Sequence, residues 1–317
     1  MRPLHGRSDK YYYFMRKSSG SGRASAAERR KSAANTLSAV LRVNSRRGSA
    51  SSRKAAPKGR KKQTSLTLPD LRIIAIPLAD EIHPGDSLGG KLLESLRQRR
   101  DKLQPGDILV IKHKIVSKSE GQLVDLSTIK PSATSRAWAK KYGLDARVIE
   151  LALRESRAVI RRKNGVLITE TRHGFIGANS GVDVSNVDGG RHAVLLPEDP
   201  ERSARQLHRE LKKRTGLAIP VLITDSFGRP WREGLMDFCI GIAGMKPLRD
   251  DRGRRDPHGY KLHASIEAVA DELAAAAGLV CGKLNRTPSC IVRGFHFEPG
   301  SSRTRDLLRP AASDLFR

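Results

Sequence analysis

The sequence has few cysteines, few aromatic residues and no long apolar run. Its three cysteines, Cys239, Cys281 and Cys290, are odd in number and lack a CxxC spacing. This pattern favours buried thiols in a reducing cytoplasm over disulfides or a zinc site. No segment approaches the roughly 18 consecutive apolar residues of a membrane-spanning helix, and no apolar signal segment follows Met1. We therefore expect a soluble, cytoplasmic protein that does not enter a membrane.

Acidic residues are almost absent from residues 1–65, which contain 18 lysines and arginines against 2 acids, so about +16 of the net charge of +27 lies there. Such a segment cannot bury enough apolar surface to offset its ordering entropy, so we predict a disordered basic tail. Three interpretations stay open: a solvated extension, an arm that binds nucleic acid or another anionic surface, and an Arg- and Ser-rich transit peptide. The rest of the chain, at about +11, is ordinary for a protein that handles anionic small molecules.

The remaining residues mix strands and helices without a regular βαβ repeat, which predicts an α+β fold. A region over 66–298 is expected to carry the activity, and 299–317 to be a C-terminal extension. Apolar runs predict strands at 71–79, 108–111, 165–172, 220–227 and 288–295. Caps and apolar stripes predict five helices. The first begins at Asp86 or Ser87, and the second ends at Gly143. The other three run from Asp145 through Val159, from Asp199 to Arg214, and over 265–278.

Two isolated carboxylates follow apolar runs and suit metal-assisted phosphate chemistry. Asp183 lies in HGFIGANSGVDVSNV, and Asp225 ends PVLITD with the hydroxyl of Ser226 beside it. Magnesium prefers such hard oxygen ligands together with the phosphates of its substrate. The alternative is structural, with Asp183 forming an Asx-turn and Asp225 ending a strand.

Basic residues near these carboxylates suit an anion site. Arg229 and Arg232 lie within DSFGRPWREG, where arginine can bind phosphate or carboxylate bidentately, although solvated turn arginines would look the same. Between them, Trp231 is expected to be a packing anchor rather than a stacking surface. Lys118 follows a predicted strand and suits a nucleotide phosphate, but there is no Walker A pattern. His173 is expected to be structural, and RRDPHGY (254–260) to be a solvated loop.

Five segments resemble successive blocks of the coenzyme F420-0:L-glutamate ligase family, the gamma-glutamyl ligases of deazaflavin biosynthesis. They cover about residues 70–297, in the family's order. The blocks are IPLADEIHPGDSL, GDILVIKHKIVSKSEG, TRHGFIGANSGVDVSNV, VLITDSFGRPWREG and PSCIVRGF.

The resemblance implies a GTP-dependent ligase that needs Mg²⁺ or Mn²⁺, is often helped by K⁺, and forms an intertwined homodimer of two-domain, mixed-sheet subunits. The family's metal ligands correspond to Asp183, Asp225 and Ser226. Its catalytic positions correspond to Asp183, Asp225 and Lys118. Its nucleotide contacts correspond to Ile76, Pro77, Leu78, Ala79, His113, Lys114, Lys118 and Asn186.

One position departs from the family pattern. Lys283, in CGKLNRTP, stands where the family has a metal-ligating Gln or Glu, and a protonated lysine cannot ligate a metal. Either one metal position differs here, or the lysine charge replaces a cation.

The implied reaction phosphorylates the terminal carboxylate of coenzyme F420-0 with GTP, after which the amine of L-glutamate attacks the acyl phosphate. No residue is identified as a general base. Two alternatives stay open: a same-fold glutamate ligase with another carboxylate acceptor, and a nucleic-acid-binding protein that uses the basic tail.

Overall fold

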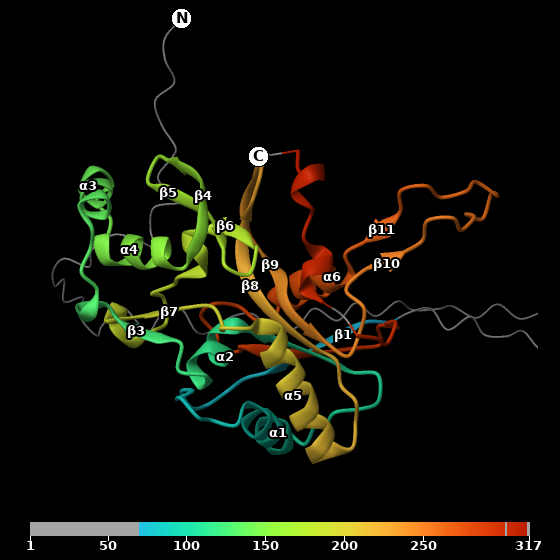
Figure 1. Cartoon of the computed structure of the whole chain (residues 1–317). Helices are drawn as coiled ribbons and strands as arrows, with labels where there is room; N and C mark the ends of the chain where they lie inside the picture. The colour runs from blue at the N-terminus through green and yellow to red at the C-terminus, as the bar shows by residue number, and fades with distance from the viewer. Residues whose placement is uncertain (1–69, 302, 316–317) are drawn as a thin grey trace, which may run out of the picture. The chain divides into compact units, whose positions relative to one another are not determined.

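A five-stranded mixed sheet forms the centre of the fold in the computed structural model, which describes residues 70–301 and 303–315 (Figure 1). The predicted basic tail, 1–65, lies outside the described residues. In strand order the sheet contains β1 (Arg72–Ile76), β12 (Ser289–Arg293), β2 (Ile108–Lys112), β8 (Val221–Arg229) and β9 (Arg232–Ala243). Only β2 and β8 pair in parallel, so the sheet is mixed.

Helices cover the two faces of this sheet. The helices α1 (Leu88–Gln98) and α5 (Pro200–Thr215) pack on the face that carries Leu109 and Ile111. The opposite face, with Ile108 and Val110, packs against α6 (Val269–Gly278). Because successive strand residues point to opposite faces, β2 is apolar throughout and contributes to both cores.

The caps expected from the sequence begin and end several helices. Ser87, rather than Asp86, caps α1 by accepting a hydrogen bond from the Gly90 N–H, and Asp199 caps α5 in the same way through Arg202. Gly143 ends α3 (Ala133–Tyr142) in the left-handed conformation that favours glycine.

A second group of elements has its own apolar clusters. Its strands pair as β3 with β7 and as β4-β5-β6, next to helices α3 and α4. The bounds are β3 Leu123–Asp125, α4 Ala146–Arg154, β4 Ser156–Lys163, β5 Val166–Thr171, β6 Ile176–Ala178 and β7 His192–Val194. The α+β class is therefore confirmed, whereas the two-domain division and the dimer stay predictions.

The helix predicted from Asp145 through Val159 is wrong in its second half. Helix α4 ends at Arg154, and β4 begins at Ser156. The β-branched Val159 and Ile160 favour a strand, and Asn164 and Gly165 both have positive φ, as a two-residue hairpin turn requires. The Asn-Gly pair therefore joins β4 to β5 instead of ending a helix.

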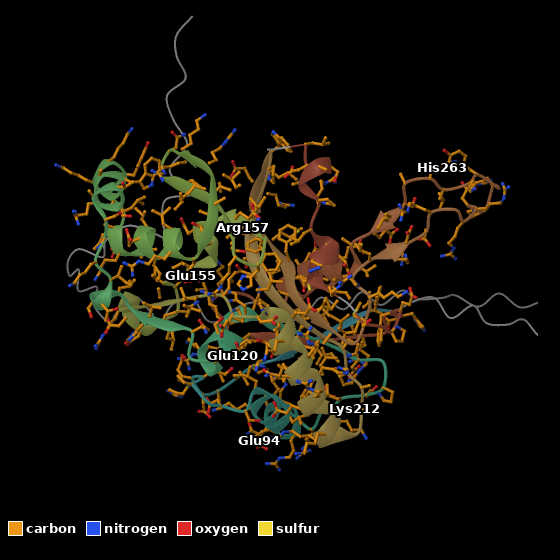
Figure 2. All side chains as sticks on the ribbon, viewed as in Figure 1. Glu94, Glu120, Glu155, Arg157, Lys212 and His263 are labelled. Atoms are coloured by element: carbon orange, nitrogen blue, oxygen red, sulfur yellow. The ribbon has the colours of Figure 1, made fainter. Side chains whose placement is uncertain are left out.

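An exposed hairpin with very short strands contains the predicted solvated loop, and Figure 2 shows His263 on it, away from the central sheet. Strands β10 (Arg249–Asp250) and β11 (Ile266–Glu267) pair at its base, and 254–260 is exposed apart from a half-buried Asp256 (Figure 1). In the described part of the chain, no helix combines the length and apolar character required to cross a bilayer.

The close approach of β9 to α5 predicts a strong effect of one added methyl group. A Cβ at Gly241 would lie 2.4 Å from the carbonyl oxygen of Pro200, so backbone would have to move. We expect Gly241→Ala to lower the free energy of unfolding by about 2–3 kcal/mol in urea titrations. Gly228→Ala is the matched control in the neighbouring strand, because a Cβ there meets no atom within 4 Å. Equal effects of the two substitutions would contradict the close packing.

The carboxylate of Glu150 joins α4 to the start of α3. It accepts hydrogen bonds from the Ser132 N–H at 2.9 Å and the Ser135 hydroxyl at 2.8 Å. The Ser132 N–H has the largest effect on the pKa of Glu150, followed by the hydroxyls of Ser132 and Ser135. Together they lower this pKa from 4.5 to about 2.

Because this pKa is depressed on folding, its stabilisation is present above pH 4.5 and is lost as the pH falls toward 2. We therefore expect the stability difference between the wild type and Glu150→Gln to shrink over that window. Urea unfolding at pH 7, 4 and 3 measures this difference, and a constant value would contradict the assignment.

Candidate active site

Three successive residues at the end of β2 each contact a different aspartate. The first closes the strand, and the other two begin helix α2 (His113–Ser119). The aspartates come from β9, β8 and the loop before β7, and all three lie far along the chain from the residues of β2 and α2 that they contact. The pairs are Lys112 with Asp237, His113 with Asp225, and Lys114 with Asp183. This basic triplet, Lys112–Lys114, therefore gathers three carboxylates at one end of β2.

Asp183 is held by charge and by backbone hydrogen bonds. Its Oδ2 lies 2.7 Å from the Lys114 ammonium, and its Oδ1 accepts the Ser185 N–H at 2.6 Å. The second contact is the Asx-turn that the sequence allowed as an alternative to a ligand role. Burial raises the pKa of Asp183, but Lys114 and Ser185 together lower it by more, so the pKa lies below its ordinary value. The side chain is therefore an anion at neutral pH.

Asp225 faces a buried histidine. Its Oδ1 lies 3.2 Å from His113 Nε2, although the geometry lacks the alignment of a hydrogen bond. The same Oδ1 accepts the Ser226 N–H at 2.7 Å. Only 2% of the His113 side chain is exposed, so the contact lies inside the protein and not at its surface.

Ser226 is directed to a different carboxylate. Its hydroxyl lies 2.6 Å from Asp237 Oδ1, and the other oxygen of Asp237 contacts Lys112. An ionised carboxylate can only accept, so the Ser226 hydroxyl donates and keeps its lone pairs available. Successive strand residues alternate in direction, which explains why Ser226 and Asp225 have different partners.

One turn further along α2, Lys118 meets the loop that contains Asn186. Its ammonium lies 2.8 Å from Glu81 and 3.3 Å from the Asn186 carbonyl oxygen. The amide of Asn186 donates to the Lys283 carbonyl at 3.3 Å. Lys118 follows the predicted strand, as expected, but it lies in helix α2 and so shares a face with Lys114.

The end of β1 reaches the same region. The Leu78 N–H donates to the Arg286 carbonyl at 3.2 Å, and the Ser289 hydroxyl donates to the Ile76 carbonyl at 3.2 Å. Pro77 and Ala79 therefore lie beside the 281–288 segment. The structure brings the predicted nucleotide segments together, with Asn186 and Lys283 linking two of them.

The sequence model that describes F420-0:gamma-glutamyl ligases matches residues 78–294, which include the basic triplet and all three aspartates. The chain belongs to the F420-0:gamma-glutamyl ligase family.

Relatives from three archaea support this membership. The coenzyme F420:L-glutamate ligase of Methanopyrus kandleri is 42% identical over 255 residues, covering 79% of this chain and 99% of the relative. The protein of the same name from Methanothermobacter thermautotrophicus is 42% identical, covering 74% of this chain and 93% of the relative. That from Methanocaldococcus jannaschii is 40% identical, covering 68% and 86% respectively.

Sequence reasoning missed three residues of this candidate site in the F420-0:gamma-glutamyl ligase fold. Lys112 and Asp237 are 125 positions apart, and nothing in their local sequence indicates their contact. Glu81, which pairs with Lys118, stands in an ordinary turn. Among the described residues no cluster of three or more His, Cys, Asp or Glu side chains forms a preassembled metal centre. Each of the three aspartates instead contacts a basic side chain, which is a lysine for two of them and a histidine for the third.

The other residues singled out in the sequence have mixed outcomes. His173 is structural as expected, since its Nε2 contacts the Glu198 carbonyl at 2.9 Å. The prediction that Trp231 is a packing anchor is wrong, because 81% of it is exposed. The turn after β8 ends the sheet's packed region, which leaves the ring outside the core.

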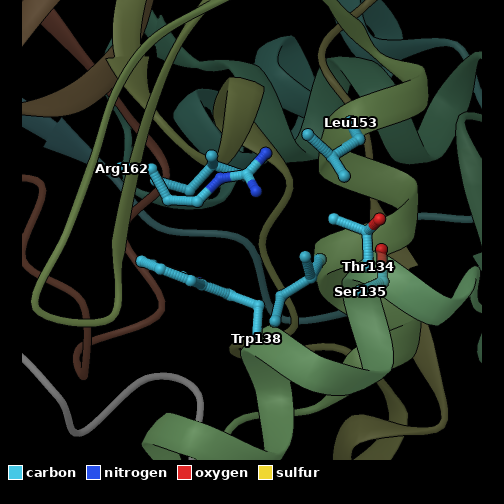
Figure 3. A pocket seen from close by; sticks show the side chains of 7 residues that line it. Thr134, Ser135, Trp138, Leu153 and Arg162 are labelled. Carbon is cyan, nitrogen blue, oxygen red and sulfur yellow. The ribbon is translucent and has the colours of Figure 1, made fainter.

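A hollow between α3, α4 and β4 is not a substrate site. Figure 3 shows Trp138, Leu153 and Arg162 around it, and the Arg162 guanidinium lies 5.5 Å from the Trp138 ring centroid. Its lining leaves no room for even a water molecule.

Proposed function

We propose that this protein joins L-glutamate to coenzyme F420-0 through an amide bond, using GTP. Family membership and the names of the relatives support this reaction class. The observation that carries the proposal is that three aspartates gather around the two lysines and the histidine of the basic triplet. Such a mixture of carboxylates and ammonium groups suits a nucleotide phosphate and the metal that accompanies it.

A free carboxylate is a poor acyl donor, so the reaction needs activation. In the proposed first step, a carboxylate oxygen of the acceptor attacks the γ-phosphorus of GTP, and GDP leaves. In the second step the amine of glutamate attacks the acyl carbon, the C–O bond to phosphate breaks, and inorganic phosphate leaves. The proton that the amine loses goes to solvent or to a base that we do not assign.

The protein's part in this reaction is mainly electrostatic. In the proposed complex, Lys118 would give up its contact with Glu81 and bind a phosphate of the nucleotide. Lys114 would bind the same nucleotide beside it. Asn186 and the backbone of 76–79 would contact GTP from two sides of the 281–288 segment. These roles follow the family pattern at positions that the fold brings together.

The donor chemistry fits a hard divalent metal. Asp183, Asp225 and the lone pairs of Ser226 are oxygen donors, which Mg²⁺ and Mn²⁺ prefer. We propose that Asp183 and Asp225 hold the metal, which when bound would neutralise charge on the phosphoryl oxygens. The Ser226 hydroxyl, which is directed to Asp237, would join them as a ligand only by turning away from that contact. A role for K⁺, the intertwined homodimer and cytoplasmic localisation are further proposals from the family resemblance.

One assay tests the central proposal. Purified protein is incubated with GTP, Mn²⁺, L-glutamate and coenzyme F420-0, then scored for GDP release and for a glutamate-sized mass gain of the acceptor. We expect both, in equal amounts for each glutamate added. GDP release without a mass gain, or neither product, would overturn the proposal. A second carboxylate acceptor in parallel tests the acceptor identity.

A further inference from the structure

The acid paired with Lys118 differs from the other lysine-paired acids of the site in its exposure. Glu81 contacts the Lys118 ammonium at 2.8 Å, and 66% of its side chain is exposed. The aspartates paired with Lys112 and Lys114 are only 5% and 25% exposed. Water can therefore solvate the carboxylate of Glu81 when it leaves the lysine, whereas the two aspartates would lose their partners in a more buried position.

The lysine is the buried member of this pair. Only 13% of the Lys118 side chain is exposed, and its ammonium also lies 3.3 Å from the Asn186 carbonyl oxygen. A carbonyl oxygen has only a partial charge, so Glu81 supplies the full negative charge beside this ammonium. The hydrogen bond from Lys118 in turn holds the pKa of Glu81 below its ordinary value. Glu81 is therefore an anion at neutral pH.

The backbone on both sides of this acid is anchored. The Leu78 N–H donates to the Arg286 carbonyl oxygen at 3.2 Å. The Gly85 N–H donates to the Ser119 carbonyl oxygen at 2.8 Å, and Ile82 is buried in the core beneath the central sheet. These contacts hold the loop against the end of α2. A change of partner therefore requires rotation of the acidic side chain and no movement of the loop.

A phosphate and a carboxylate compete for such an ammonium. Both are anions that accept hydrogen bonds through oxygen, and a lysine ammonium is a compact point charge that pairs with either. Two anions that share one ammonium lie close enough to repel each other. A phosphate that binds Lys118 therefore has to displace Glu81, and this displacement weakens its binding.

We propose that Glu81 is an internal competitor for the phosphate position at Lys118, which weakens the binding of inorganic phosphate and GDP and so promotes the release of both products. The inference rests on the proposed function and names a residue that regulates that same site. As a product leaves, the carboxylate returns to the lysine, so one anion replaces another and the buried ammonium is never left unpaired.

Removal of the charge provides the first test. Glu81→Gln keeps the length of the side chain and an oxygen that can accept a hydrogen bond. We expect this variant to bind inorganic phosphate and GDP about 3- to 10-fold more tightly than the wild type in isothermal titration calorimetry. The dissociation rate of a fluorescent GDP analogue in stopped flow should fall by a similar factor. Unchanged affinities, or a dissociation rate equal to that of the wild type, would overturn the proposal.

Two further variants separate competition from a general effect of charge. Glu94→Gln removes an acid of α1 that pairs with Arg97 at 2.8 Å on the surface, and it should leave the phosphate affinity within about twofold of the wild type. Glu81→Asp keeps the charge on a shorter side chain, so its affinity should lie between those of the wild type and Glu81→Gln. An equal gain in Glu94→Gln and Glu81→Gln would contradict a specific competition.

The competition also requires the lysine. In a Lys118→Met background the carboxylate of Glu81 has lost its partner, so Glu81→Gln should produce less than half of its effect on phosphate affinity in the wild-type background. Calorimetry with inorganic phosphate measures all four proteins of this cycle. The same gain in both backgrounds would show that Glu81 acts through its charge alone, and the proposal would be wrong.

The outcomes separate this inference from the proposed function. Binding of inorganic phosphate and GDP is measured without glutamate or acceptor. A wild type that binds both but adds no glutamate contradicts the function, while the Glu81→Gln comparison still decides the competition. A wild type that ligates glutamate, with Glu81→Gln binding phosphate no more tightly, contradicts the competition alone. Proteins that bind neither phosphate nor GDP contradict both.

Discussion

Asp183→Asn is expected to reduce glutamate ligation by roughly 10²- to 10³-fold, because it removes an anionic ligand of the metal that we propose neutralises charge on the phosphoryl group. The substitution preserves shape, and the Ser185 N–H can still be accepted by the amide oxygen. It also leaves the Lys114 ammonium without its nearest anion. Initial rates of GDP release and the product mass measure the effect, and circular dichroism checks that the fold persists.

Asp188→Asn is the matched control for that experiment. Asp188 lies five residues further along the same loop, is 67% exposed, and pairs with His192 at 3.1 Å. We expect its turnover to stay within twofold of the wild type. Wild-type turnover in Asp183→Asn, or an equal loss in both variants, would contradict the role assigned to Asp183.

Asp237→Ala is expected to lower the free energy of unfolding by about 2–3 kcal/mol, because it leaves Lys112 without a partner. Only 21% of the lysine side chain and 5% of the aspartate side chain are exposed, so water replaces the lost contact poorly. The change also removes the acceptor for the Ser226 hydroxyl. Urea unfolding at pH 7 measures the loss.

A double variant separates loss of the ion pair from loss of packing. Lys112→Met with Asp237→Leu replaces both charges by apolar groups, and we expect it to recover at least half of the lost stability. Asp250→Asn is the surface control, since Asp250 pairs with Arg252 where both are about half exposed and water replaces the lost contact, so we expect no measurable loss of stability. A double variant no more stable than Asp237→Ala would contradict the pairing.

Local rules predicted the elements better than their junctions. The caps at Ser87 and Asp199 and the left-handed Gly143 follow from the chemistry of single residues. The error at Val159 arose because an apolar stripe in a helix was continued into a strand of similar composition. The Asn-Gly turn that distinguishes the two lies after the ambiguous segment, at the far end of β4.

The candidate site was predictable only where motifs identify it. Asp183, Asp225 and Lys118 were singled out from their local sequence, the resemblance suggested their roles, and the fold brings their segments together. Asp237 was not found, because its partner Lys112 lies in another strand and only the sheet register joins them. The exposure of Trp231 depends on where the sheet stops being covered, which local sequence does not encode.

The basic triplet has a consequence for how ligands communicate. Its members share two peptide bonds, yet they hold β9, β8 and the loop before β7. We expect a ligand that draws one aspartate away to shift the backbone on which the other two depend. Occupancy at Asp183 and occupancy at Asp225 are then linked, and by reciprocity each must alter the affinity of the other by the same factor. Metal at these aspartates and nucleotide at Lys114 are therefore expected to bind with mutual dependence, through a span no longer than a tripeptide.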